Sequence, residues 1–102
     1  MNNVHDDYTV HIAVLLLELH IHESGSLKSK RKIIKSLKDR VHAKFNVSFA
    51  ELAENDKWQR AVCGVSMIGN DRRYLDGCMQ EILNLVRSGH EAVLVNSSLE
   101  FL

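Results

Sequence analysis

Residues 10 to 22, VHIAVLLLELHIH, form the stretch of this 102-residue chain on which the fold depends. Its apolar residues occupy every second position on one face, from Ala13 to Ile21, and the other face is also apolar from Val10 to Leu16. Alternation with a period of two is typical of a β-strand, and an apolar first half on both faces is typical of a central or doubly covered strand. We therefore predict a strand that is central in a sheet or covered on its second face by another subunit.

An amphipathic helix is predicted directly after this strand, with its cap at Ser26 or Ser29 and its end at Asn46. Apolar residues recur there at three- and four-residue steps: Leu27, Ile34, Leu37, Val41 and Phe45. This spacing places them in one stripe on the helix. Lys30 and Lys38 flank the stripe, and we expect their methylene stems to cover the core edge while their ammonium groups reach solvent.

The rest of the chain has the pattern of two strands, a helix and a last strand. The predicted strands cover 47–52, 60–68 and about 91–96, and the second helix runs from a cap at Asp71 to Ser88-Gly89. Two right-handed crossovers joined by a hairpin place both helices on one face of a four-stranded antiparallel sheet, the ferredoxin-like βαββαβ arrangement. We expect one α+β domain over residues 10–102, preceded by a loose segment over residues 1–9.

The other face of this sheet is predicted to be apolar. The residues expected there are Val10, Ile12, Val14, Leu16, Val62 and Ile68. A small monomer does not normally leave such a patch exposed to water. We therefore expect a homodimer, or another protein partner, on the open sheet face.

Composition places the chain among ordinary globular proteins, with 45% hydrophobic and 25% charged residues. The longest apolar run, Ile12 to Leu17, falls far short of the roughly 18 to 20 residues of a membrane helix, and the start of the chain lacks a signal-peptide pattern. We expect a cytoplasmic protein with no membrane partner. Cys63 and Cys78 have no disulfide or zinc spacing, and we assign both to the core.

Positive charge is concentrated in residues 26–44, which hold eight of the thirteen Lys and Arg residues and one acid, Asp39. Three of these cations are predicted to project outward, Lys28, Lys32 and Lys35, and Arg31 is their neighbour in the same cluster. Cations in the first turns of a helix oppose its dipole at about 0.3 to 1 kcal/mol each, and like charges at four-residue spacing repel. Stability alone would not choose this arrangement.

We predict that this face binds the phosphate backbone of a nucleic acid, because a row of cations several turns long suits a polyanion. Free N–H groups at the helix start and the Ser24-Gly25-Ser26 turn would converge on a phosphate there. Two alternatives stay open: the face is merely solvated, or acids such as Glu51, Glu54 and Asp71 neutralise part of it.

Several segments resemble the YlxP-like family of small bacterial proteins of unknown function. They are LELHI at 17–21, GSLKSKRKIIKSLKDR at 25–40, FNVSFAE at 45–51, DKWQRA at 56–61 and NDRRY at 70–74. The resemblance covers residues 10–88. It implies a ferredoxin-like fold and a bacterial cytoplasmic protein encoded among transcription and translation factors, and that company suggests RNA or a ribosomal subunit as the partner.

Trp58 is the only tryptophan, at a point where a loop enters a strand, with Arg60 two residues later. Its commoner role would be to cap one end of the core. The alternative is a partner-facing or base-stacking aromatic, which would make Trp58 and Arg60 further nucleic-acid contacts. The exposure of the indole distinguishes the two roles.

A metal site and an active site are both disfavoured. Glu18, His20 and His22 share a strand face, and two histidines at alternate positions can meet one metal, but no third ligand stands at a diagnostic spacing. The chain has no glycine-rich phosphate loop, Cys-His pair or paired-carboxylate motif. We predict no catalytic residue, no metal and no cofactor. The sequence thus favours a non-enzymatic RNA- or ribosome-associated protein, with a protein-interaction module using the open sheet face as the alternative.

Overall fold

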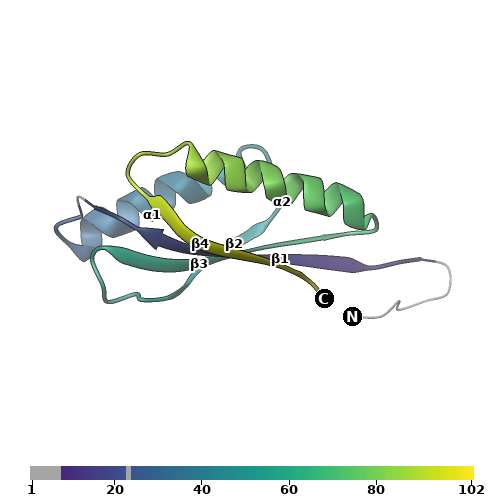
Figure 1. Ribbon diagram of the computed structural model, residues 1–102, viewed down its shortest axis with the longest axis horizontal. Helices are drawn as coiled ribbons and strands as arrows, with labels where there is room; N and C mark the ends of the chain where they lie inside the picture. Colours follow the sequence, from purple (N-terminus) through teal and green to yellow (C-terminus); the bar gives the residue numbers. More distant parts are fainter. Residues whose placement is uncertain (1–7, 23) are drawn as a thin grey trace.

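The computed structural model describes residues 8–22 and 24–102, which form six elements in the order βαββαβ. The strands are β1 (His11–His20), β2 (Ser48–Ala53), β3 (Arg60–Gly69) and β4 (Val93–Phe101), and the helices are α1 (Leu27–His42) and α2 (Arg72–Arg87). Both helices lie on one side of the sheet (Figure 1). The predicted ferredoxin-like fold is confirmed. Most of the segment expected to be loose, residues 1–9, falls outside the described residues.

Strand β1 is central, as its two apolar faces predict. The sheet order is β2-β3-β1-β4, and β1 pairs antiparallel with both β3 and β4. The β1 residues that face the helices are fully or almost fully buried: Ala13, Leu15, Leu17 and Leu19. The core therefore lies between the helix layer and the sheet, with β1 beneath it.

Two predicted boundaries are wrong. Helix α1 ends at His42 and not at Asn46, because the N–H groups of Lys44 and Phe45 both donate to the Val41 carbonyl and close the helix with a turn. Phe45 still packs on the core. Because it stands four residues after Val41, the pattern of apolar residues predicted a further helical turn there. Strand β4 begins later and extends much further than residues 91–96, since it pairs with β1 as far as Phe101 opposite Ala13.

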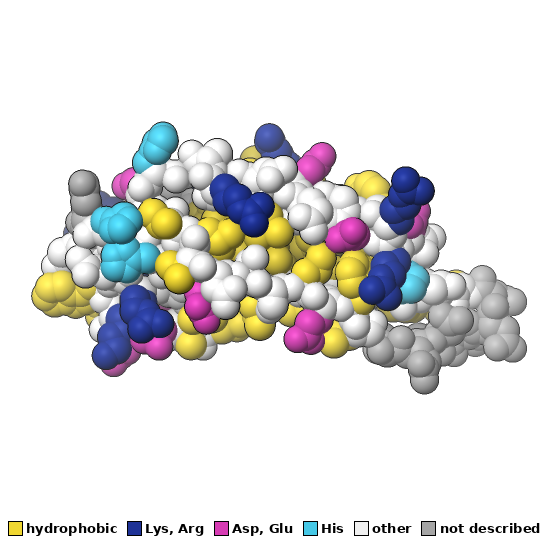
Figure 2. Space-filling view, in the orientation of Figure 1, with side chains coloured by type: hydrophobic (Ala, Val, Ile, Leu, Met, Phe, Trp, Pro, Cys, Tyr) yellow, Lys and Arg dark blue, Asp and Glu magenta, His cyan; other side chains and the backbone are white. Residues whose placement is uncertain are grey.

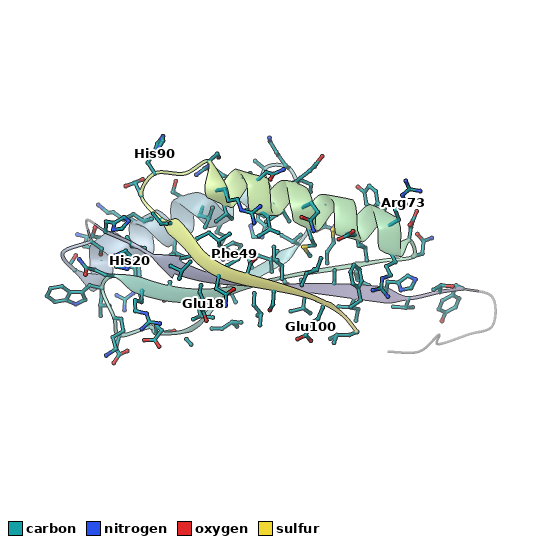
Figure 3. The ribbon with its side chains drawn as sticks, in the orientation of Figure 1. Glu18, His20, Phe49, Arg73, His90 and Glu100 are labelled. Carbon is teal, nitrogen blue, oxygen red and sulfur yellow. The ribbon has the colours of Figure 1, made fainter. Side chains whose placement is uncertain are left out.

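The sheet face away from the helices carries the expected apolar residues. Ile12 lies opposite Ile68, which is 70% exposed, and Leu16 lies opposite Gly64. Leu52, which the sequence pattern did not assign to this face, packs over Gly64: a Cβ there would lie 2.6 Å from Leu52 Cδ1. Acidic Glu18 and Glu100 project from this side of the sheet (Figure 3). The open face is thus an apolar patch with acids near its margin.

Candidate nucleic-acid interface

Helix α1 begins with a side-chain cap and no acid in its first turn. Ser26 is extended, with φ −164°, and its Oγ accepts a hydrogen bond from the Ser29 N–H at 3.0 Å. The Ser24 hydroxyl donates to the Ser26 carbonyl at 2.9 Å, which braces the turn before the helix. The cap leaves the positive end of the helix dipole without an acidic residue in this turn, so no acid of the first turn compensates the nearby cations.

Lys30 is separated from the other cations of α1 because it is fully buried. Its Nζ donates to Glu51 Oε2 at 2.8 Å, to the Glu54 carbonyl at 2.8 Å and to the Arg60 carbonyl at 3.2 Å. Three donors thus meet three acceptors, as an ammonium group requires when it is removed from water. The expectation that this ammonium group reaches solvent is wrong, whereas the suggested neutralisation by Glu51 is correct for Lys30.

The buried ammonium group also fixes the loop between β2 and β3. Glu54 and Arg60 lie at the two ends of this loop, and Glu54 adopts a left-handed φ of 64° that a non-glycine residue rarely takes. Because both of their carbonyls bind Lys30, the loop is held against the first turns of α1. The sequence did carry one signal for this role: Lys30 stands four residues before Ile34, in line with the apolar stripe.

The outer face of α1 presents the predicted cations. Lys28, Arg31 and Lys32 are exposed, and none of them forms an ion pair with any residue in 8–22 or 24–102. Lys35 differs, because its Nζ lies 2.7 Å from Asp39 Oδ2, although both side chains are mostly exposed. From Lys28 to Lys35 the row extends about 10 Å along the helix axis.

The Lys35 ammonium group has a measurable consequence for its partner. Its hydrogen bond to Asp39 lowers the pKa of that carboxyl group against an opposing effect of burial, and the charges of Lys35, His42 and Lys38 act in the same direction as the hydrogen bond. Asp39 therefore stays ionised and compensates part of the charge of Lys35. Of the four predicted contacts, Lys28, Arg31 and Lys32 are fully available to an external anion.

Trp58 does not cap the core: its side chain is 54% exposed. Arg60 is exposed too, while its backbone carbonyl accepts from Lys30. The structure therefore brings together two regions that are far apart in the sequence, since the loop that carries Trp58 lies against the start of the basic helix. No local sequence signal indicates this proximity.

Histidine and cysteine side chains are the other candidates for reactive groups in the described residues. His20 and His22 meet edge to face, with ring centroids 4.4 Å apart, but no cluster of three or more His, Cys, Asp or Glu side chains suited to a metal occurs in the described part of the chain. Cys63 and Cys78 are free and buried, as predicted. Burial, with a smaller effect of the Glu51 charge, raises the pKa of Cys63 to about 12, so this thiol is a poor nucleophile.

Three findings relate the chain to known proteins. The family described as "Protein of unknown function (DUF503)" matches residues 12–99. The chain is 37% identical over 71 residues to the uncharacterized protein YlxP of Bacillus subtilis (strain 168), and this match covers 70% of the chain and 77% of YlxP. A dimeric ferredoxin-like protein of unknown function from Thermobifida fusca YX aligns with a TM-score of 0.51 over 100% of this chain and 97% of that one, at 8% identity.

The last of these likenesses concerns the fold alone, because so few residues are shared. Among the helices of the described residues, none is long and apolar enough to cross a membrane. The family match spans most of the chain, and it includes both α1 and the loop that carries Trp58. The chain belongs to the YlxP-like family of proteins of unknown function (DUF503).

Proposed function

We propose that this protein is a non-enzymatic, cytoplasmic RNA- or ribosome-associated protein that binds a phosphate backbone through the outer face of α1. One observation carries the proposal: Lys28, Arg31 and Lys32 are exposed and have no acidic partner in the described residues. Two other lysines of the same helix each have an acidic partner. Lys30 and Lys35 show that this fold can compensate cations of α1 internally. The positions of the cations without an acidic partner are not explained by the stability of the fold.

The position of this row supports a polyanion as the partner. The cations stand in the first half of α1, where the helix dipole and the four-residue spacing of Lys28 and Lys32 both oppose them. An arriving chain of phosphates is attracted by the positive end of the helix dipole, offsets the repulsion between the two lysines and releases counterions. RNA is preferred to DNA because the family resemblance implies a protein encoded among transcription and translation factors.

The test is a triple charge reversal, Lys28→Glu/Lys32→Glu/Lys35→Glu. It should abolish co-sedimentation with ribosomal subunits and binding to RNA, because the phosphate backbone would then meet three carboxylates. The far-UV circular dichroism spectrum should stay unchanged, since all three side chains are exposed. Co-sedimentation at the wild-type level would contradict the proposal.

The open sheet face supports a second function, protein interaction or homodimerisation. Leu52 and Ile68 are 56% and 70% exposed, and Leu52 borders an apolar groove of about 250 Å³ over Gly64. The similar fold from Thermobifida fusca is described as dimeric. Association through this face should persist at high salt, whereas association through α1 should weaken steeply. Sedimentation equilibrium in high salt tests the second function. If it is correct, the wild-type protein is a dimer and the Leu52→Glu and Ile68→Glu variants are monomers.

A further inference from the structure

The loop between β2 and β3 presents its indole beside an open concavity. The concavity has a volume of about 450 Å³, and its lining is His20, Asp56, Lys57, Trp58, Gln59 and Arg60. Trp58 is 54% exposed, and it is among the largest apolar side chains that the described structure leaves in contact with solvent. Covering this exposed indole with a partner would therefore gain free energy.

This loop is held in place by bonds along its length. The Lys57 N–H donates to the Glu54 carbonyl at 3.0 Å, and the Ile21 N–H donates to the Gln59 carbonyl at 2.9 Å. The Gln59 side chain in turn donates to the His22 carbonyl at 3.0 Å. Trp58 is therefore flanked on both sides by anchored residues, and a partner that uses it would not have to order the loop first.

The same loop is joined to the basic helix. Lys30 Nζ, from the first turns of α1, donates to carbonyls at both ends of the loop. Lys57 and Arg60 add exposed cations beside the indole, against one acid in the concavity, Asp56. The exposed aromatic ring thus has two exposed cations beside it, on a loop that is bonded to α1. An aromatic ring among cations is the combination found in proteins that bind single-stranded nucleic acids.

We propose that Trp58 is a stacking platform for an unpaired base of single-stranded RNA whose backbone lies on the outer face of α1. This inference rests on the proposed function and adds the strandedness of the ligand to it. The flat faces of the indole and of a base stack without regard to base identity, so the contact selects unpaired over paired RNA but not one sequence over another. Duplex RNA keeps its bases stacked on one another and offers phosphates alone.

The experiment uses the fluorescence of Trp58, the only tryptophan of the chain, together with anisotropy of labelled RNA. The probes are single-stranded oligoadenylate, the same strand with abasic sites, and a duplex of equal phosphate number. Oligoadenylate should quench Trp58, whereas the abasic strand and the duplex should bind without quenching. Trp58→Leu should weaken oligoadenylate binding about fivefold to 100-fold and leave binding of the abasic strand and the duplex unchanged.

The possible failures are distinct. If none of the three probes binds the wild-type protein, the proposed function fails, and the stacking role fails with it. If all three bind with equal affinity to the wild type and to Trp58→Leu, without quenching, only the stacking role is overturned. A change of Trp58 emission that depends on protein concentration in the absence of RNA overturns it as well, because the indole would then be a contact between copies of the chain.

Discussion

The two helices have equal length and similar capping but differ in what they bury and what they expose. Each has 16 residues and an N-terminal side-chain cap, from Ser26 for α1 and Asp71 for α2. Helix α2 buries six residues, none of them charged, whereas α1 buries four, and one of these is Lys30. Helix α1 has seven Lys and Arg residues against one acid, and α2 has three against two.

The difference indicates a division of labour. Helix α2 serves the core, and its cation Arg72 lies 4.3 Å from the ring centroid of Phe101, where it adds to packing. On the face formed by α2 and β4, single Lys and Arg side chains are separated by other residues (Figure 2). In helix α1, a buried ion pair occupies part of the face that meets the core. The helix also carries exposed cations that no acid in the described structure compensates. Packing and stability thus account for α2 more fully than for α1.

The largest expected effect comes from breaking the buried pair of α1 with Lys30→Met. Glu51 would lose its partner while its side chain stays only 18% exposed, and the Glu54 and Arg60 carbonyls would lose a donor. We expect the free energy of unfolding, measured in urea, to fall by about 3 kcal/mol.

Two variants make this result specific. Lys35→Met removes the exposed ion pair of the same helix and should leave the urea midpoint almost unchanged. Lys30→Met/Glu51→Leu should recover part of the loss, because no unpaired carboxylate then remains. Equal losses for Lys30→Met and Lys35→Met would show that burial does not distinguish the two lysines.

A smaller effect is expected from neutralising exposed cations, and it should differ between the helices. Lys28→Gln/Lys32→Gln on α1 should make the dependence of log K on log salt for single-stranded RNA shallower by about 1.4, since each lost phosphate contact contributes about 0.7. The matched variant on α2, Arg73→Gln/Arg87→Gln, removes the same charge from exposed positions and should leave the slope unchanged. Equal changes in both variants would mean that RNA responds to net charge and not to the α1 face.

The smallest effect near neutral pH concerns the thiol of Cys63, which lies opposite Glu51 in the sheet and so close to the buried end of α1. Its pKa is raised from 9.0 in the unfolded chain to about 12, so the native state keeps a proton that the unfolded state releases. This contribution to stability is complete below about pH 9 and is lost as the pH rises toward 12. The unfolding free energy should therefore fall more steeply with alkaline pH in the wild type than in Cys63→Ala. If the unfolding free energies of the wild type and Cys63→Ala fall equally with pH, this prediction is wrong.

Local periodicity was sufficient to predict the element order, the central place of β1 and the two faces of the sheet. A period of two or of 3.6 residues reports which side of an element meets the core, whatever the partner is. The Asp71 cap and the end of α2 near Ser88 also follow from neighbouring residues, and both are confirmed. The exposed positions of Lys28, Arg31 and Lys32 on α1 are predictable for the same reason.

Only the tertiary structure decided what these residues meet. Lys30 finds its acceptors 21, 24 and 30 residues further along the chain, so its place in line with the apolar stripe puts it near the core but no local pattern identifies these partners. The exposure of Trp58 and its nearness to α1 depend on the same contacts. Strand β4 extends to Phe101 because β1 offers it a partner that far. Local sequence determines which way a side chain points, whereas the identity of its neighbour depends on how distant segments pack.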